Sequence, residues 1–156
     1  MDVSYMIFNP SGNITALVIG DKYNLEQRIL INNRIMEKET IVEQVGFISQ
    51  KNRKLTMAGG EFCGNATRCA TLYYIGEQKS IELEINNNKI KAGINENLEV
   101  WCEVPIEGYN IEKICKDIYR VILKGITILV VKKIANYNDL KRSAINLIQK
   151  YNLDDN

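Results

Sequence analysis

The amino-acid sequence predicts an α+β fold in which a strand-rich first half is followed by the beginning of a second, similar half. Three observations predict it. Short apolar runs alternate with turns rich in Asn and Gly, two longer segments have helical periodicity, and parts of the first half recur near the end of the chain. The length of 156 residues suits one domain with its own core, or one domain and part of another.

The first half is expected to begin with a β-hairpin. Residues 3–9 and 14–20 have strand-like composition, and the turn Asn-Pro-Ser-Gly-Asn separates them. A helix should follow over residues 23–39, with Asn24 placed to cap its start. Its helical periodicity predicts an apolar face formed by Leu25, Ile29 and either Ile35 or Met36.

Strands dominate the rest of the first half. Residues 41–49 and 54–59 are predicted to form two of them, and 61–77 a turn that leads into a buried helix stopped by Gly76. Three further strands, separated by Asn-rich turns, are expected at 80–86, 89–95 and 98–105.

The chain then repeats itself in part. Residues 14–18, Ile-Thr-Ala-Leu-Val, are echoed by Ile-Thr-Ile-Leu-Val at 126–130, and Tyr-Asn-Leu at 23–25 by Tyr-Asn-Asp-Leu at 137–140. Two short matches also fit coincidence, but their common order and similar offset favour a duplication. We therefore expect a first half over residues 1–117 and a truncated beginning of a similar half over 118–156. The equivalent of Cys63 would then lie beyond the end of this chain.

The charge distribution argues against nucleic acid and membranes as partners. The 20 basic and 19 acidic residues give a net charge of +1 and form no long run of one sign. No apolar stretch approaches the roughly 20 residues that span a bilayer, and the first residues lack the layout of a secretory signal. These features predict a cytoplasmic protein.

The cysteines indicate free thiols. Cys63, Cys69, Cys102 and Cys115 have neither the spacing of a zinc site nor the density of a disulfide scaffold, so no metal is expected. The chain contains no histidine, so acid/base chemistry would use Cys, Asp, Glu, Lys or Tyr.

Cys63 has the most informative surroundings. It lies just before a predicted helix in the run Gly-Gly-Glu-Phe-Cys-Gly-Asn-Ala-Thr, where glycines and unpaired amide groups favour a bound anion and a thiolate. The alternative is a small buried residue at a helix start. Cys69, Cys102 and Cys115 are expected to be packing residues.

The run EFCGNATRC resembles the cysteine-glycine-asparagine signature of the diaminopimelate epimerase family. Within that family, NPSGN-x-T, EQVGFI and EFCGNAT are most similar to the histidine racemases of opine metallophore pathways. The resemblance implies two similar domains, each a strand-rich barrel around a central helix. It also implies racemisation or epimerisation of an amino acid by two thiols, without pyridoxal phosphate or another cofactor.

The resemblance also implies roles for individual residues. Cys63 would be one of the two acid/base thiols. Gly64 and Asn65 would bind the α-carboxylate and amino group of the substrate, and Asn13 and Gln44 match substrate-contacting positions. Glu61 would orient the substrate or be a solvated loop carboxylate, and Arg68 would have a structural role.

Three hypotheses remain open from the sequence. The leading one is the N-terminal half of an amino-acid racemase or epimerase, with histidine or diaminopimelate as substrate. The second is a non-catalytic amino-acid-binding or assembly module. The third is a homodimer in which each chain supplies one Cys63 across a two-fold axis. A phenazine-type isomerase is a weaker enzyme alternative, because that family usually has His where this chain has Asn65.

Overall fold

The computed structural model describes residues 3–20, 23–105, 108–123, 126–133 and 139–151. The chain divides into two compact units, residues 1–105 and 106–156. The predicted second half beginning at residue 118 is defined by the sequence repeat. A division into compact units does not test a repeat, so this boundary stays a prediction. Each unit is described by itself.

The first unit is built on one mixed sheet of seven strands in the order β1-β2-β3-β4-β5-β6-β7. Two neighbouring pairs, β2 with β3 and β4 with β5, are parallel, and the other pairs are antiparallel. Each parallel pair is joined through a helix, as a parallel connection requires. The strands are Tyr5–Phe8, Thr15–Ile19, Gln44–Ile48, Lys54–Met57, Ser80–Ile85, Asn88–Ile94 and Val100–Cys102.

Helix α2, Gly64–Tyr74, lies inside the curl of this sheet and contacts β2 through β7. Ala66 and Ala70 on the helix are fully buried, and their small side chains allow close approach to the strands. Leu17 of β2 and Leu83 of β5 are among the apolar residues that meet the helix in the main core. The helix ends at Tyr74, and Gly76 follows with φ +53°, which confirms the predicted glycine stop.

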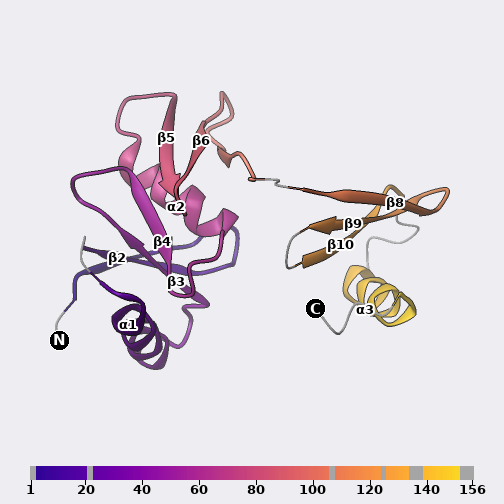
Figure 1. Ribbon diagram of the computed structural model, residues 1–156, viewed down its shortest axis with the longest axis horizontal. Helices are drawn as coiled ribbons and strands as arrows, with labels where there is room; N and C mark the ends of the chain where they lie inside the picture. Colours follow the sequence, from indigo (N-terminus) through magenta and orange to yellow (C-terminus); the bar gives the residue numbers. More distant parts are fainter. Residues whose placement is uncertain (1–2, 21–22, 106–107, 124–125, 134–138, 152–156) are drawn as a thin grey trace. The chain divides into compact units, whose positions relative to one another are not determined.

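Helix α1, Leu25–Lys38, covers the other face of the sheet, and Figure 1 shows α1 and α2 on opposite sides of β2 and β3. Alternate residues of β2 and β3 therefore belong to different cores, and Ala16, Val18, Val45 and Phe47 face α1. Strands buried on both faces read as continuous apolar runs, as these two do.

The predicted cap of α1 is confirmed, but its predicted apolar face is wrong. The side chain of Asn24 accepts a hydrogen bond from Gln27 N, and Gln27 completes a capping box. Leu25 and Ile29 are exposed, as is Met36, and of the four named residues only Ile35 is buried. The helix packs through Ile31 and Ile35, one turn apart, so the row that starts at Leu25 faces away from the sheet.

The predicted α+β class is confirmed as a curled half-barrel. In the described part of the chain, β1 and β7 end the sheet and do not pair with each other. Strands are found at all seven predicted places of the first unit, although β7 retains only Val100–Cys102 of the expected residues 98–105. The hairpin of β1 and β2 is antiparallel, and its turn places Ser11 and Gly12 at positive φ.

The second unit contains a three-stranded antiparallel sheet, in the order β10-β9-β8, and helix α3. Its elements are β8 Asn110–Cys115, β9 Ile118–Leu123, β10 Ile126–Val131 and α3 Leu140–Lys150. The predicted echo at 126–130 is a strand, whereas β8 and β9 were not expected. Residues 137 and 138 of the second echo lie outside the described residues. None of the described residues of α3 is buried.

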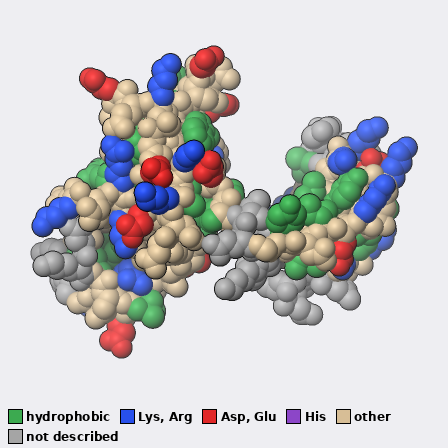
Figure 2. All heavy atoms as spheres, turned by 45° about the horizontal axis from the view of Figure 1, so that its top comes forward, with side chains coloured by type: hydrophobic (Ala, Val, Ile, Leu, Met, Phe, Trp, Pro, Cys, Tyr) green, Lys and Arg blue, Asp and Glu red, His purple; other side chains and the backbone are tan. Residues whose placement is uncertain are grey.

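Surface charges of both signs are mixed. Figure 2 shows Lys or Arg side chains interspersed with Asp or Glu side chains on the face of the first unit that it draws. The helices of the described ranges include none that is long and apolar enough to cross a membrane.

The buried core predicts a large cost for truncating Leu83, which is fully buried in β5 beneath α2. Leu83→Ala should lower the free energy of unfolding by about 2–5 kcal/mol, because it removes apolar contacts and leaves a cavity. Urea unfolding followed by far-UV circular dichroism measures this. Leu98→Ala is the matched control, because Leu98 is 83% exposed, and it should change stability by less than about 0.5 kcal/mol. Equal effects of the two variants would contradict the core assignment.

Candidate active site

Strand register brings the candidate residues to one edge of the sheet. Thr15 and Gln44 are paired at the starts of the parallel strands β2 and β3. Strand β4 runs antiparallel to β3, so the loop that follows β4 returns to the edge where Gln44 begins its strand. Cys63 lies at the end of this loop, where α2 begins. Segments far apart in the sequence therefore meet at the start of α2.

Cys63 is the N-cap of α2. Its backbone is extended, with φ −132° and ψ 113°, and its Sγ accepts a hydrogen bond from Ala66 N at 3.4 Å. Its carbonyl oxygen accepts the first intrahelical hydrogen bond, from Thr67 N at 2.9 Å. The thiol is thus held beside the unpaired amides and the positive end of the helix dipole, an environment that stabilises negative charge.

A chain of amide hydrogen bonds holds the other side of the thiol. Cys63 Sγ donates to Gln44 Oε1 at 2.9 Å. Gln44 Nε2 donates to Asn13 Oδ1 at 2.6 Å and to Thr15 Oγ1 at 2.7 Å. The structure therefore brings together Asn13, Gln44 and Cys63, three of the residues predicted from the sequence, with Gly64 next to them as the first residue of the helix.

Asn65 and Glu61 do not join this network. The Asn65 Oδ1 atom accepts a short hydrogen bond from the guanidinium of Arg68, one turn along α2. Glu61 is exposed, and its carboxylate lies against Gly59, so that a Cβ built there would be 2.6 Å from Glu61 Oε2. Among the described residues Glu61 makes no hydrogen bond or ion pair.

Two residues that bond to members of this site were missed by the sequence analysis. Thr15 is fully buried and bonded to Gln44, and Cys102 Sγ donates to Gly64 O at 3.7 Å. Thr15 carried a signal, since it is the threonine of the NPSGN-x-T run. The position of Cys102 depends on the pairing of β7 with β6 and has no local signal.

The other thiols have different environments. Cys69 is buried, and burial raises its pKa from 9.0 to about 11, partly offset by a hydrogen bond with Thr15 and by the charge of Arg68. Burial also raises the pKa of half-buried Cys102, again offset in part by Arg68. The predicted packing role is confirmed for Cys69 and wrong for Cys115, which is exposed on β8.

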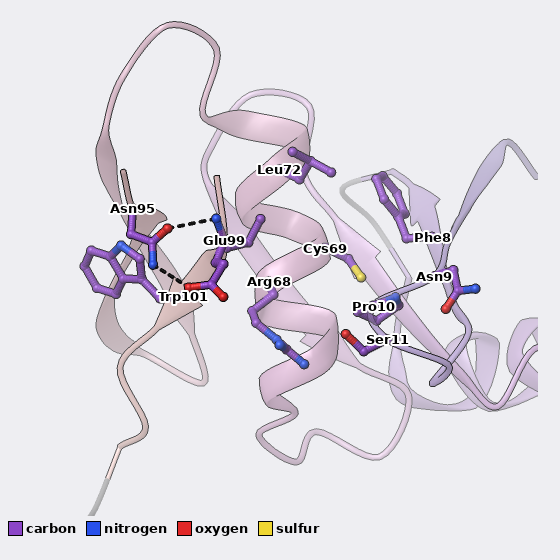
Figure 3. Close-up of a pocket in the computed structure, with 11 residues that line it drawn as sticks. Phe8, Asn9, Pro10, Ser11, Arg68, Cys69, Leu72, Asn95, Glu99 and Trp101 are labelled. Atoms are coloured by element: carbon purple, nitrogen blue, oxygen red, sulfur yellow. Dashed lines mark hydrogen bonds between the residues drawn. The ribbon is translucent and has the colours of Figure 1, made fainter. Parts of the chain in front are cut away.

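An open groove of about 540 Å³ runs along the side of α2 (Figure 3). Arg68, Cys69 and Leu72 of the helix face it, between the turn that follows Phe8 and the strand that carries Trp101. At its rim the side chain of Asn95 donates to Glu99 Oε2 at 2.8 Å. The groove is lined by none of the six predicted site residues. Groups of three or more Cys, Asp or Glu side chains suited to a metal ion are absent from the described residues.

The known proteins that this chain resembles in sequence include histidine racemases. A histidine racemase of Fusobacterium nucleatum subsp. nucleatum (strain ATCC 25586) is 28% identical over 169 residues, which cover 96% of this chain and 62% of that protein. A histidine racemase of Staphylococcus aureus (strain Mu50) is 39% identical over 72 residues, 42% of this chain and 26% of that protein. The chain thus spans 62% of the length of the Fusobacterium relative.

These matches confirm the predicted likeness to amino-acid racemases, and in particular to histidine racemases. The family model of the histidine racemase CntK N-terminal domain matches residues 2–122. The chain belongs to this family of histidine racemase N-terminal domains.

The raised pKa of Cys69 predicts a pH dependence of stability. The folded thiol keeps its proton up to about pH 11, whereas the unfolded thiol ionises near 9.0, so the folded state binds more protons between these values. The stability that the raised pKa of Cys69 contributes is therefore complete below pH 9 and is lost as the pH rises toward 11. The stability advantage of the wild type over Cys69→Ala should shrink across this range in urea titrations. An advantage that stays constant or grows with pH would contradict the assignment.

Proposed function

We propose that this chain forms the N-terminal half of a cofactor-independent amino-acid racemase in which Cys63 is one of two acid/base thiols. The observation that carries the proposal is the position of Cys63 as N-cap of α2, with its Sγ 2.9 Å from Gln44 Oε1, in a chain of the histidine racemase family. The resemblance to diaminopimelate epimerases supplies the expectation of a second thiol.

The local geometry supports acid/base work by this thiol. The helix start stabilises a thiolate, and the carbonyl oxygen of Gln44 accepts the proton of a thiol, so both protonation states have a partner. Inversion at an α-carbon removes a proton from one face and returns one to the other. One thiol cannot reach both faces of a fixed substrate, so the reaction needs a second group opposite Cys63.

The same helix start supports binding of the substrate carboxylate. The N–H groups of Gly64 and Asn65 precede the first intrahelical hydrogen bond, that of Thr67 N, and so are available to an anion. We assign the α-carboxylate to these groups, with Asn13, Gln44 and Glu61 contacting the rest of the amino acid. Histidine is the favoured substrate because the matched relatives are named histidine racemases, and diaminopimelate is the alternative.

A second, similar half is part of the proposal, and the second unit supports it. Its hairpin of β9 and β10 is followed by α3, the order of β1, β2 and α1. The registers correspond, because Tyr5 pairs with Val18 in the first hairpin and Tyr119 with Val130 in the second. The second thiol would come from a longer form of the protein or, in the homodimer alternative, from a second copy. We keep the cytoplasm as its location, where thiols stay reduced.

The test is hydrogen exchange at the substrate α-carbon. The protein isolated from its own cells, at whatever length it occurs there, should incorporate deuterium from D₂O into the α-position of D- and L-histidine. Cys63→Ser should lower this rate at least about 10³-fold, because a serine hydroxyl is a far weaker acid/base group at neutral pH. Proton NMR of the histidine α-signal measures the exchange.

The control for this test is Cys115→Ser, which changes an exposed thiol of the second unit and should leave the rate unchanged. Exchange that persists in Cys63→Ser would remove Cys63 from the mechanism. Saturable binding of histidine without exchange in the native protein would favour the amino-acid-binding module instead.

A further inference from the structure

Thr15 is a completely buried polar side chain that is linked to the candidate thiol through Gln44. Its hydroxyl donates to the carbonyl oxygen of Asn13 at 3.1 Å and accepts from Gln44 Nε2 at 2.7 Å. A hydroxyl has one proton, and here that proton is used on the Asn13 carbonyl. The Thr15 oxygen is therefore presented to Gln44 as an acceptor, and the group of Gln44 that faces it must be the NH₂.

This arrangement orients the whole Gln44 amide. With Nε2 directed to Thr15 Oγ1 and Asn13 Oδ1, Oε1 is directed to Cys63 and meets its S–H. A carbonyl oxygen is a suitable partner for a protonated thiol and an unsuitable one for a thiolate. Rotation of the amide by 180° would reverse this preference by turning an N–H toward the sulfur.

We propose that Thr15 is a positioning residue that holds the Gln44 amide with its oxygen toward Cys63, the orientation that suits the thiol and not the thiolate. Its importance for catalysis rests on the proposed function of Cys63, but the orientation itself does not. When Cys63 gives up its proton, the Gln44 amide rotates and donates an N–H to the thiolate, and the Asn13 side chain turns to follow it.

The hydrogen bonds of Thr15 differ between the two orientations of the Gln44 amide. In the observed orientation Thr15 donates to Asn13 O and accepts from Gln44 Nε2, in addition to its hydrogen bond with Cys69. In the rotated orientation its single proton goes to Gln44 Oε1, and the bond to the Asn13 carbonyl is lost. Thr15 therefore favours the observed orientation by about one hydrogen bond, and its removal favours the thiolate.

The other ionisable groups around the thiol belong to residues that the Thr15 substitution leaves unchanged. They are Arg68 and Cys69 on α2, Cys102 on β7 and Glu61 in the loop before the helix. Strands β2 and β3, which carry Thr15 and Gln44, contribute no ionisable side chain. Cys69 loses a hydrogen bond that lowers its pKa, so it stays protonated through the neutral range.

The experiment measures the pH dependence of Cys63 alkylation by iodoacetamide in this chain. Trypsin releases residues 55–68, which contain Cys63 and no other cysteine, so mass spectrometry follows this thiol alone. Thr15→Val keeps the shape of the side chain and removes the hydroxyl with its hydrogen bonds to Asn13, Gln44 and Cys69. Its midpoint should fall by roughly 0.5–1 pH unit, a three- to tenfold change in the thiol–thiolate equilibrium. A midpoint that is unchanged or higher would overturn the proposal.

Two variants control for packing. Thr71→Val changes another fully buried threonine, whose hydroxyl donates only within α2, to Thr67 O at 2.7 Å, and it should keep the wild-type midpoint. Thr15→Ser keeps the hydroxyl and should restore most of the wild-type behaviour. An equal shift in Thr71→Val, or the full Thr15→Val shift in Thr15→Ser, would mean that packing and not the hydroxyl sets the midpoint.

A measurement on the unaltered chain decides the matter if Thr15→Val does not fold. The side-chain amide protons of Gln44 should show nuclear Overhauser contacts with the Thr15 methyl group below the Cys63 midpoint and lose them above it. Contacts that persist at every pH, or that titrate equally in Cys63→Ala, would overturn the proposal. Neither measurement needs turnover. If the protein shows no α-proton exchange, the proposed function fails, but the proposed role of Thr15 can still be tested.

Discussion

The packing of α2 into the curled sheet is the interaction on which the rest of the first unit depends. The helix contacts strands β2 through β7, and its alanines let those strands approach closely. Burial of this face removes apolar surface of both helix and sheet from water, the main favourable term in folding. Cys63 is the last residue before the helix, so the same packing fixes the position of the thiol.

Parallel pairing of β2 and β3 provides the second constraint. Because α1 connects these strands over one face, both faces of the pair are covered, and polar side chains there must satisfy one another. Thr15, Gln44 and Asn13 do so through a closed set of hydrogen bonds that ends at the thiol. The geometry of this polar cluster follows from strand register, because the register pairs Thr15 with Gln44.

Local signals predicted most of the first unit. Asn24 and Gly76 mark helix ends by the chemistry of capping, which depends only on nearby residues. The buried face of α1 was mispredicted because Leu25 and Ile29 are as apolar as Ile31, and only the sheet decides which row is covered. Strands β8 and β9 were missed because charged residues such as Lys113 and Arg120 interrupt their apolar pattern.

The sequence predicted which residues belong to the candidate site better than it predicted the hydrogen bonds among them. A motif identifies Cys63, and resemblance adds Asn13 and Gln44, which the structure places within hydrogen-bonding reach of one another. The separate positions of Glu61 and Asn65 depend on loop geometry and on Arg68. The contribution of Thr15 depends on where one hydroxyl proton points, which no sequence pattern encodes.

Successive side chains of β2 and β3 point into two different cores, and this affects how mutations on these strands act. Ala16 and Val45 face α1, yet each is the chain neighbour of a residue that bonds within the site, Thr15 or Gln44. A larger side chain at either position would move the backbone and disturb the opposite face. Deep mutational scans should therefore find intolerant positions far from any substrate, and this intolerance reports on shared strands instead of direct participation in chemistry.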